Sequence, residues 1–191
     1  MLIYIVRHGL TEWNKLKKLQ GAADVPLAKE GILLAEKTGE ALKDVKFDIC
    51  FTSPLSRARQ TAECVLGDRN VPIIPDKRIQ EINFGDLEGG CVRDAEGNYI
   101  DPQVETFFRD PVNFKRPENG EDIFDVIART KDFWEEKTSD PSLAALPIWI
   151  KRFWLLPTDV QSVHSSRISI MIRKISGTDA CLRTAVSILW K

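Results

Sequence analysis

The chain has 191 residues, of which 43% are hydrophobic and 29% are charged, and its formal net charge is -1 at pH 7. This length predicts one domain over residues 1–191, with a single sizeable core. The nearly balanced charge excludes a global basic field for nucleic acid or an anionic membrane, so an anionic ligand must be bound by local groups.

The first half of the chain alternates between predicted strands and helices. Residues 2–6 form a continuous apolar run, typical of a strand that is buried on both faces of a parallel sheet. Residues 31–43 have the spacing of an amphipathic helix, and residues 47–52 form a second apolar run. Ser53 and Pro54 then supply an N-cap and a first-turn proline for a helix that reaches Leu66.

Later segments continue the alternation. We expect a third short strand at residues 71–74, an excursion over the surface at residues 101–120, and another helix at residues 121–137. Strands that alternate with helices favour an α/β fold. The predicted architecture is a three-layer α/β/α sandwich around a mostly parallel sheet.

A candidate nucleophile follows the first strand, in Arg7-His8-Gly9. Open α/β sheets bind ligands at the carboxyl ends of their strands. A neutral imidazole can attack phosphorus when arginine holds the phosphoryl oxygens, and a glycine would let the backbone approach closely. An Arg-His pair that only caps a loop is the alternative interpretation of this tripeptide.

The second constellation is the run Ser53 to Ala62, where the buried helix face leaves Arg57 in the first turn, near the positive helix end. Arg57 and Arg7 can then clamp one phosphate, whereas we expect Arg59 to be a solvated surface charge. An ordinary amphipathic helix is the alternative.

The third constellation, residues 79–89, alternates apolar and polar side chains before it turns at glycines. A carboxylic acid here can protonate a leaving oxygen. We favour Glu81 over Glu88, because Glu81 lies nearer the core and burial raises a carboxyl pKa. A charged strand edge is the alternative.

Together these three segments resemble the histidine phosphatase (phosphoglycerate mutase-like) superfamily over roughly residues 1–147. The resemblance implies that His8 is phosphorylated, that Arg7 and Arg57 bind the phosphoryl group, and that Glu81 donates the proton. The intervening motifs, such as Gln20-Gly21 and Asp24-Val25-Pro26-Leu27, belong to the same pattern.

Four further positions match those that contact the phosphate or the rest of the substrate in this family: Thr11, Asn14, Gln20 and Gly21. The stretch from Asn119 to Asp122 is similar to a later Gly-Glu-Ser element, with aspartate in place of serine. The resemblance implies no metal and no cofactor.

The residues of the motif from Gln20 to Leu27 and the short length of the chain resemble the hydrolytic branch of the family. This resemblance implies a phosphatase of a small phosphorylated metabolite. An isomerase of the phosphoglycerate mutase type is the first alternative. A phosphate-binding relative with impaired catalysis is the second. The sequence specifies neither the substrate nor an oligomeric state.

The family also needs a second histidine, in a Ser/Thr-His-Gly segment that follows an apolar strand. The other histidine of this chain, His164, has no glycine after it. From about residue 148 the chain loses its strand-helix pattern. Codons for residues 156–166, read one base out of register, permit Thr-His-Gly-Cys-Ala-Val-Arg. We therefore hypothesise that a frameshift near Ile148 replaced the family's C-terminal part.

The remaining features bear on location. The four cysteines form no C-x-x-C pair, and no leader precedes the first strand, which favours a reducing cytoplasm. The longest apolar runs, between Leu143 and Leu156, are interrupted by Pro147, Lys151 and Arg152. Because none of them reaches the roughly 20 residues of a membrane span, we expect no membrane insertion.

Overall fold

The computed structural model of the chain describes residues 2–139 and 168–173, so that His164 and most of the atypical C-terminal part lie outside the described residues. The larger elements are, in chain order, β1 (Leu2–Arg7), α1 (Glu12–Lys15), α2 (Lys29–Ala41), β2 (Ile49–Thr52), α3 (Ser56–Leu66), β3 (Ile73–Pro75), α4 (Pro102–Arg109), α5 (Ile123–Ser139) and β4 (Ile168–Arg173). The described residues also include the short 3-10 helices η1 (Lys77–Ile79), η2 (Gly85–Leu87) and η3 (Pro111–Asn113).

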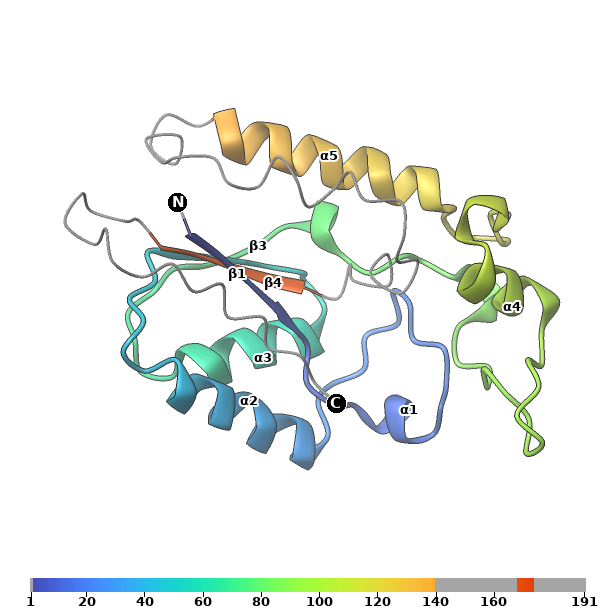
Figure 1. The fold of residues 1–191 in the computed structure, drawn as a ribbon, viewed down its shortest axis with the longest axis horizontal. Coiled ribbons are helices and arrows are strands. Elements are labelled where there is room, and N and C mark those ends of the chain that lie inside the picture. The colour runs from blue at the N-terminus through green and yellow to red at the C-terminus, as the bar shows by residue number, and fades with distance from the viewer. Residues whose placement is uncertain (1, 140–167, 174–191) are drawn as a thin grey trace.

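The described strands form one sheet in the order β1-β4-β2-β3. β4 is antiparallel to both β1 and β2, and β2 is parallel to β3, so that β1, β2 and β3 share one direction. Figure 1 shows α5 on one face of this sheet and α2 and α3 on the other. The predicted three-layer α/β/α sandwich is confirmed, with one antiparallel strand inserted into it.

The inserted strand comes from the atypical C-terminal part. β4 pairs along the whole length of β1, from Leu2 with Arg173 to Arg7 with Ile168. The family resemblance predicts an apolar strand that leads into a second histidine. β4 contains no histidine, and its antiparallel direction takes its carboxyl end away from the end of β1 that carries His8.

The core lies on both faces of the sheet. On one face, Tyr4 and Val6 of β1 pack against a cluster from α2, α3 and β2 that includes Ala35 and Val65. On the other face, Ile3 packs with Phe51 and with Phe133 of α5. A third cluster, centred on Phe84, lies beneath α4. β1 is not buried throughout, because Ile5 is 50% exposed.

One prediction about local structure was wrong. Ser53 does not cap α3; its hydroxyl accepts the N–H of Leu55 within the preceding turn, and Leu55 is the N-cap residue. The excursion over residues 101–120 includes α4, which Asp101 caps through the N–H groups of Gln103 and Val104. The alternative of a charged strand edge at residues 79–89 is excluded, because η1 and η2 flank an extended loop there.

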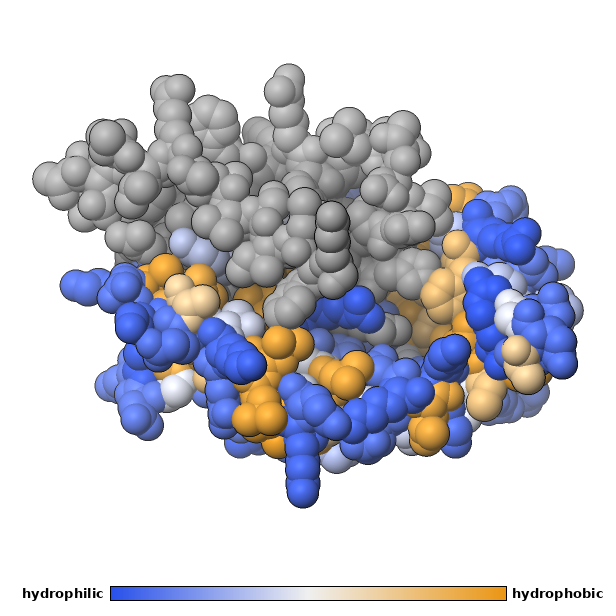
Figure 2. All heavy atoms as spheres, turned by 60° about the horizontal axis from the view of Figure 1, so that its bottom comes forward, coloured by the Kyte–Doolittle hydropathy of each residue, from blue (hydrophilic) through white to orange (hydrophobic). Residues whose placement is uncertain are grey.

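The surface on the α2 side is largely hydrophilic, with smaller apolar areas between the polar side chains (Figure 2). Exposed apolar side chains within α2 and the segment between β1 and α2 include Leu10, Leu16 and Leu33. Within the described residues, no helix combines the length and the apolar character that a membrane span requires.

Candidate active site

His8 follows β1 directly and is 8% exposed. Its Nδ1 atom lies 2.6 Å from the carbonyl oxygen of Gly9. Because a carbonyl oxygen only accepts hydrogen bonds, Nδ1 must be the donor, and in a neutral ring Nε2 then carries the lone pair. The tautomer is therefore the one in which Nε2 can act as a nucleophile.

The turn after His8 is fixed by close backbone packing. A Cβ atom on Gly9 would lie 2.6 Å from the carbonyl oxygen of Gly31, and one on Gly31 would lie 2.1 Å from that of Leu10. The space beside Gly9 is thus taken by the backbone of α2, which approaches this glycine closely. The N–H of Gly9 also donates to Oγ1 of Thr61 in α3, at 3.0 Å.

Arg57 lies in the first turn of α3, as predicted, and is 1% exposed. Its guanidinium donates to the carbonyl oxygens of Gly21 and Ala23, each at 2.6 Å. Thr61 links it to the His8 turn, because its hydroxyl donates to the Arg57 carbonyl oxygen at 2.7 Å. The structure therefore brings together His8, Arg57 and the Gln20-Gly21 loop.

The N-terminus of α3 is capped from the same loop. Asp24 accepts the N–H of Ser56 at 2.7 Å and also its hydroxyl. An aspartate at a helix N-terminus satisfies free N–H groups and interacts favourably with the helix dipole. Arg7, in contrast to the buried Arg57, is exposed at the end of β1. Arg59 was expected to be a surface charge, and its side chain is 67% exposed and pairs with Glu63.

Thr11 is fully buried and organises two predicted substrate-binding amides. Its backbone N–H donates to Asn14 Oδ1 at 3.0 Å, and its hydroxyl lies 3.0 Å from that atom and 2.8 Å from Gln20 Oε1. Both amide oxygens therefore face Thr11, and both NH₂ groups point elsewhere. Although Gln20 is buried, its Nε2 has no hydrogen-bond partner among the described residues.

Glu88 joins two segments of the site. Its Oε1 atom accepts the N–H of Ala22 at 2.6 Å and that of Phe84 at 2.9 Å. Gly21 has φ +54°, and a Cβ atom there would lie 2.1 Å from the same oxygen. Burial raises the pKa of Glu88, while the N–H donors and the charge of Arg57 oppose this rise. Glu88 is thus a structural carboxylate between the Gln20-Gly21 loop and the Glu81 segment.

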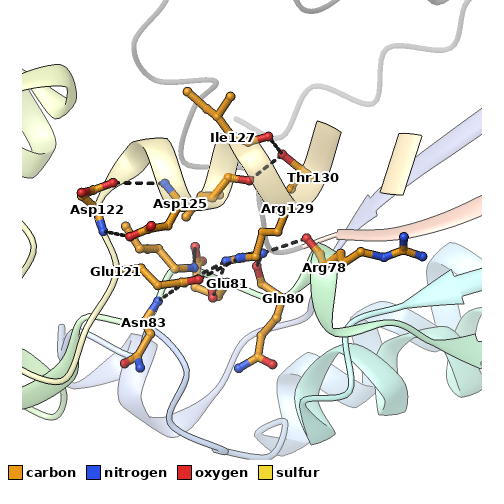
Figure 3. A network of polar contacts seen from close by, with 12 residues as sticks. Arg78, Gln80, Glu81, Asn83, Glu121, Asp122, Asp125, Ile127, Arg129 and Thr130 are labelled. Carbon is orange, nitrogen blue, oxygen red and sulfur yellow. Dashed lines mark hydrogen bonds and ion pairs between the residues drawn. The ribbon is translucent and has the colours of Figure 1, made fainter. Parts of the chain in front are cut away.

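Glu81, the predicted acid, is 4% exposed, which confirms that it lies in the core. Its Oε1 atom accepts the N–H of Ile82 at 3.1 Å. A network of polar contacts surrounds its backbone (Figure 3). Arg129 of α5 donates hydrogen bonds to three carbonyl oxygens of this backbone, those of Arg78, Gln80 and Glu81.

The excursion over residues 101–120 returns to this segment. Glu121 accepts the N–H of Asn83 at 2.9 Å, and its own N–H donates to the Asn83 carbonyl oxygen at 2.8 Å. Asp122 then caps α5 by accepting the N–H groups of Phe124 and Asp125. Aspartate in place of the family's serine keeps an N-cap residue at this point.

Three residues that hold the site together were not predicted in this role from the sequence: Thr61, Arg129 and Glu88. Thr61 was predicted only as part of a buried helix face. Glu121 belonged to a recognised element, but nothing in its spacing from Arg129 indicated an ion pair. Because these contacts join segments far apart in the sequence, no local pattern reports them.

Residues 3–145 match the family model of the histidine phosphatase superfamily (branch 1). A relative from Bacillus subtilis (strain 168), the uncharacterized phosphatase PhoE, is 40% identical over 107 residues, which cover 54% of this chain and 55% of the relative. A 2,3-bisphosphoglycerate-dependent phosphoglycerate mutase from Methylobacterium sp. (strain 4-46) is 37% identical over 67% of this chain and 63% of its own length.

The fold is also similar to a solved structure, YhfR from Bacillus stearothermophilus, with a TM-score of 0.62 and 34% identity over 71% of this chain and 67% of that one. The chain thus spans between half and two thirds of the length of the curated relatives above. The matched region ends at residue 145, close to the break at residue 148 that the sequence indicated. Because the match covers most of its residues, the chain belongs to the histidine phosphatase superfamily, branch 1.

Proposed function

We propose that the chain is a phosphatase of small phosphomonoesters that acts through a phosphohistidine on His8. The observation that carries this proposal is the 2.6 Å contact between Nδ1 of His8 and the Gly9 carbonyl oxygen, which makes Nδ1 the donor and, in a neutral ring, leaves the lone pair on Nε2. A nucleophile that is oriented by a hydrogen bond on its far side needs no further reorganisation before it attacks.

The reaction consists of two displacements at phosphorus. Nε2 of His8 forms an N–P bond as the P–O bond to the alcohol breaks, and Glu81 gives its proton to the departing oxygen. Water then attacks the phosphohistidine, with Glu81 taking its proton, and phosphate leaves as the N–P bond breaks. No metal or cofactor takes part in this proposal.

Phosphate binding is assigned to the predicted set. Arg57 and Arg7 hold the phosphoryl oxygens, because guanidinium groups bind phosphate bidentately. Asn14 and Gln20 add amide N–H donors, which the contacts of Thr11 with their oxygens support. Arg57 also fixes the loop at Gly21 through its carbonyl oxygen. In this proposal Thr11 acts on the substrate through the two amides.

A second candidate is isomerase action on a phosphoglycerate, which the Methylobacterium relative favours because its name states that activity. The two reactions differ in the fate of the phosphoryl group. A phosphatase releases inorganic phosphate, whereas a mutase returns the phosphoryl group to the product. Phosphorus NMR of a reaction with 3-phosphoglycerate distinguishes them.

The main test is turnover of 4-nitrophenyl phosphate by the full chain. We expect phosphate release that is lost in His8→Ala and retained in His164→Ala, the matched histidine control. Turnover that survives in His8→Ala would refute the mechanism. Phosphate binding without turnover by the unmutated chain would instead favour a catalytically impaired relative.

We propose that such impairment would come from a frameshift near Ile148. Two observations support this origin: the family match ends at residue 145, and the antiparallel β4 occupies the position beside β1. Sequencing the DNA around codon 148 tests it directly. A frame that restores Thr-His-Gly is expected, and an undisturbed frame without that motif would exclude the hypothesis.

A further inference from the structure

We propose that Arg129 and Glu121 are a positioning pair for the acid Glu81, and that they affect the rate chiefly for substrates whose leaving oxygen must be protonated. This inference rests on the proposed function, since it assigns a supporting pair to the predicted acid. Neither residue is assigned a contact with substrate; both act through the backbone that carries Glu81.

Arg129 fixes the backbone on the N-terminal side of the acid. Its Nη1 atom donates to the carbonyl oxygens of Arg78 at 2.8 Å and Gln80 at 2.7 Å, and its Nη2 atom donates to that of Glu81 at 3.2 Å. A guanidinium presents its donors in a rigid plane, so one side chain sets the direction of several peptide groups. A lysine could not reproduce these contacts with a single ammonium.

Glu121 fixes the backbone on the C-terminal side. Its Oε2 atom accepts the N–H of Asn83 at 2.9 Å, and the Asn83 carbonyl oxygen accepts the N–H of Glu121. The same carboxylate receives Nε and Nη2 of Arg129 at 2.9 Å and 3.0 Å. The acid therefore lies between two anchored peptide groups, and one bidentate ion pair joins the anchors (Figure 3).

The pair is more shielded than the exposed ion pairs of this chain. The side chains of Arg129 and Glu121 are 18% and 26% exposed, whereas those of Arg59 and Glu63 are 67% and 47% exposed. Exposed pairs contribute little to stability because water and salt screen them. A shielded, bidentate pair with additional backbone contacts holds its geometry better.

The orientation of the Glu81 carboxylate depends on this backbone, because its Oε1 atom accepts the N–H of the next residue, Ile82. A general acid works only within hydrogen-bond distance of the oxygen that it protonates. Displacing it slows the departure of an alkoxide. A nitrophenolate leaves without protonation, so its departure is affected far less.

The experiment compares two esters of similar size, 4-nitrobenzyl phosphate and 4-nitrophenyl phosphate, through kcat/KM, which includes only the steps up to departure of the alcohol. For Arg129→Lys and Glu121→Gln we expect kcat/KM to fall about 30-fold with the benzyl ester and less than about 3-fold with the phenyl ester. Glu81→Gln should give the same pattern more strongly. Arg59→Lys, the matched arginine control, should leave both values unchanged.

Equal losses with the two esters, or no loss with either, would overturn the inference while leaving the proposed function intact. Failure of the unmutated chain to turn over either ester would count against the proposed function instead. In that case amide hydrogen exchange decides the inference. Faster exchange at Ile82 and Asn83 in Arg129→Lys, with unchanged exchange in α3, would support the pair, and unchanged exchange at both amides would overturn it.

Discussion

The two halves of the candidate site are held by different kinds of contact. The turn that carries His8 is fixed by backbone packing of Gly9 against Gly31 and by a neutral hydrogen bond to Thr61. The segment that carries Glu81 is fixed by the ionisable side chains Arg129, Glu121 and Glu88, in contacts with backbone N–H and carbonyl groups. One half depends on shape, and the other depends on charge.

This difference suits the two proposed chemical roles, with His8 as nucleophile and Glu81 as acid. The nucleophile must keep one ring nitrogen aimed at phosphorus, and dense backbone packing provides a rigid support for it. The acid must exchange a proton during the cycle, and the contacts of Arg129 and Glu121 with the backbone around it hold it in position while it does so. The two halves are therefore expected to fail under different substitutions and different conditions.

The largest expected effect is on the packed half. In Gly31→Ala the new methyl group would lie 2.1 Å from the Leu10 carbonyl oxygen. Because that neighbour is backbone and cannot rotate away, we expect the free energy of unfolding to fall by about 3 kcal/mol. Chemical denaturation measures this. Glu36→Ala on the exposed face of α2 is the control, and a Gly31→Ala variant as stable as that control would contradict the packing account.

A somewhat smaller effect is expected in the charged half. Glu88→Ala leaves the N–H groups of Ala22 and Phe84 without their acceptor, which should cost about 2 kcal/mol of unfolding free energy. Glu88→Gln keeps an acceptor oxygen and should restore most of that loss at pH 7. If Glu88→Gln and Glu88→Ala were equally destabilised, the stabilisation from Glu88 would not come from its hydrogen bonds to the backbone.

The pH dependence of the same pair of variants sharpens the comparison. Burial raises the pKa of Glu88 in the folded chain, so its contribution is greatest below the ordinary glutamate pKa and declines as the pH rises through the folded value. Wild type should therefore gain stability relative to Glu88→Gln as the pH is lowered from 7 towards 4.5. A difference between them that stays constant over this range would show that no shift exists.

The smallest effect is expected for the hydroxyl that links the His8 turn to α3. Thr61→Val keeps the shape of the side chain and removes the acceptor of the Gly9 N–H, for an expected loss of about 1 kcal/mol. Because this contact is neutral, the loss should be the same in low and high salt. Thermal unfolding at both salt concentrations measures it, and strong salt dependence would argue against the division between the two halves.

The sequence predicted those parts of the fold and site that depend on local patterns. The apolar run before His8 and the periodicity around Arg57 were sufficient for β1, α3 and the place of Arg57 in the first turn of α3. The alternation at residues 79–89 left a strand edge open as the alternative, but Ile82 and Phe84 are buried from a loop, where apolar spacing does not require a strand.

What the sequence could not predict are contacts between distant segments. Asp24 caps α3 across 32 positions, which no pattern around Ser53 reveals. Arg129 contacts Glu81 across 48 positions, and the direction of β4 is specified by pairing rather than by composition. Such features arise from tertiary packing, which overrides local propensity.

The central claim is that His8 carries the phosphoryl group on Nε2. The most direct measurement is to mix the full chain with 4-nitrophenyl phosphate, quench in alkali, where phosphohistidine survives, and map the phosphate by mass spectrometry. The account predicts phosphate on the peptide that contains His8, and none in His8→Ala. Turnover with phosphate on another residue, or with no phosphoenzyme and full activity in His8→Ala, would contradict it.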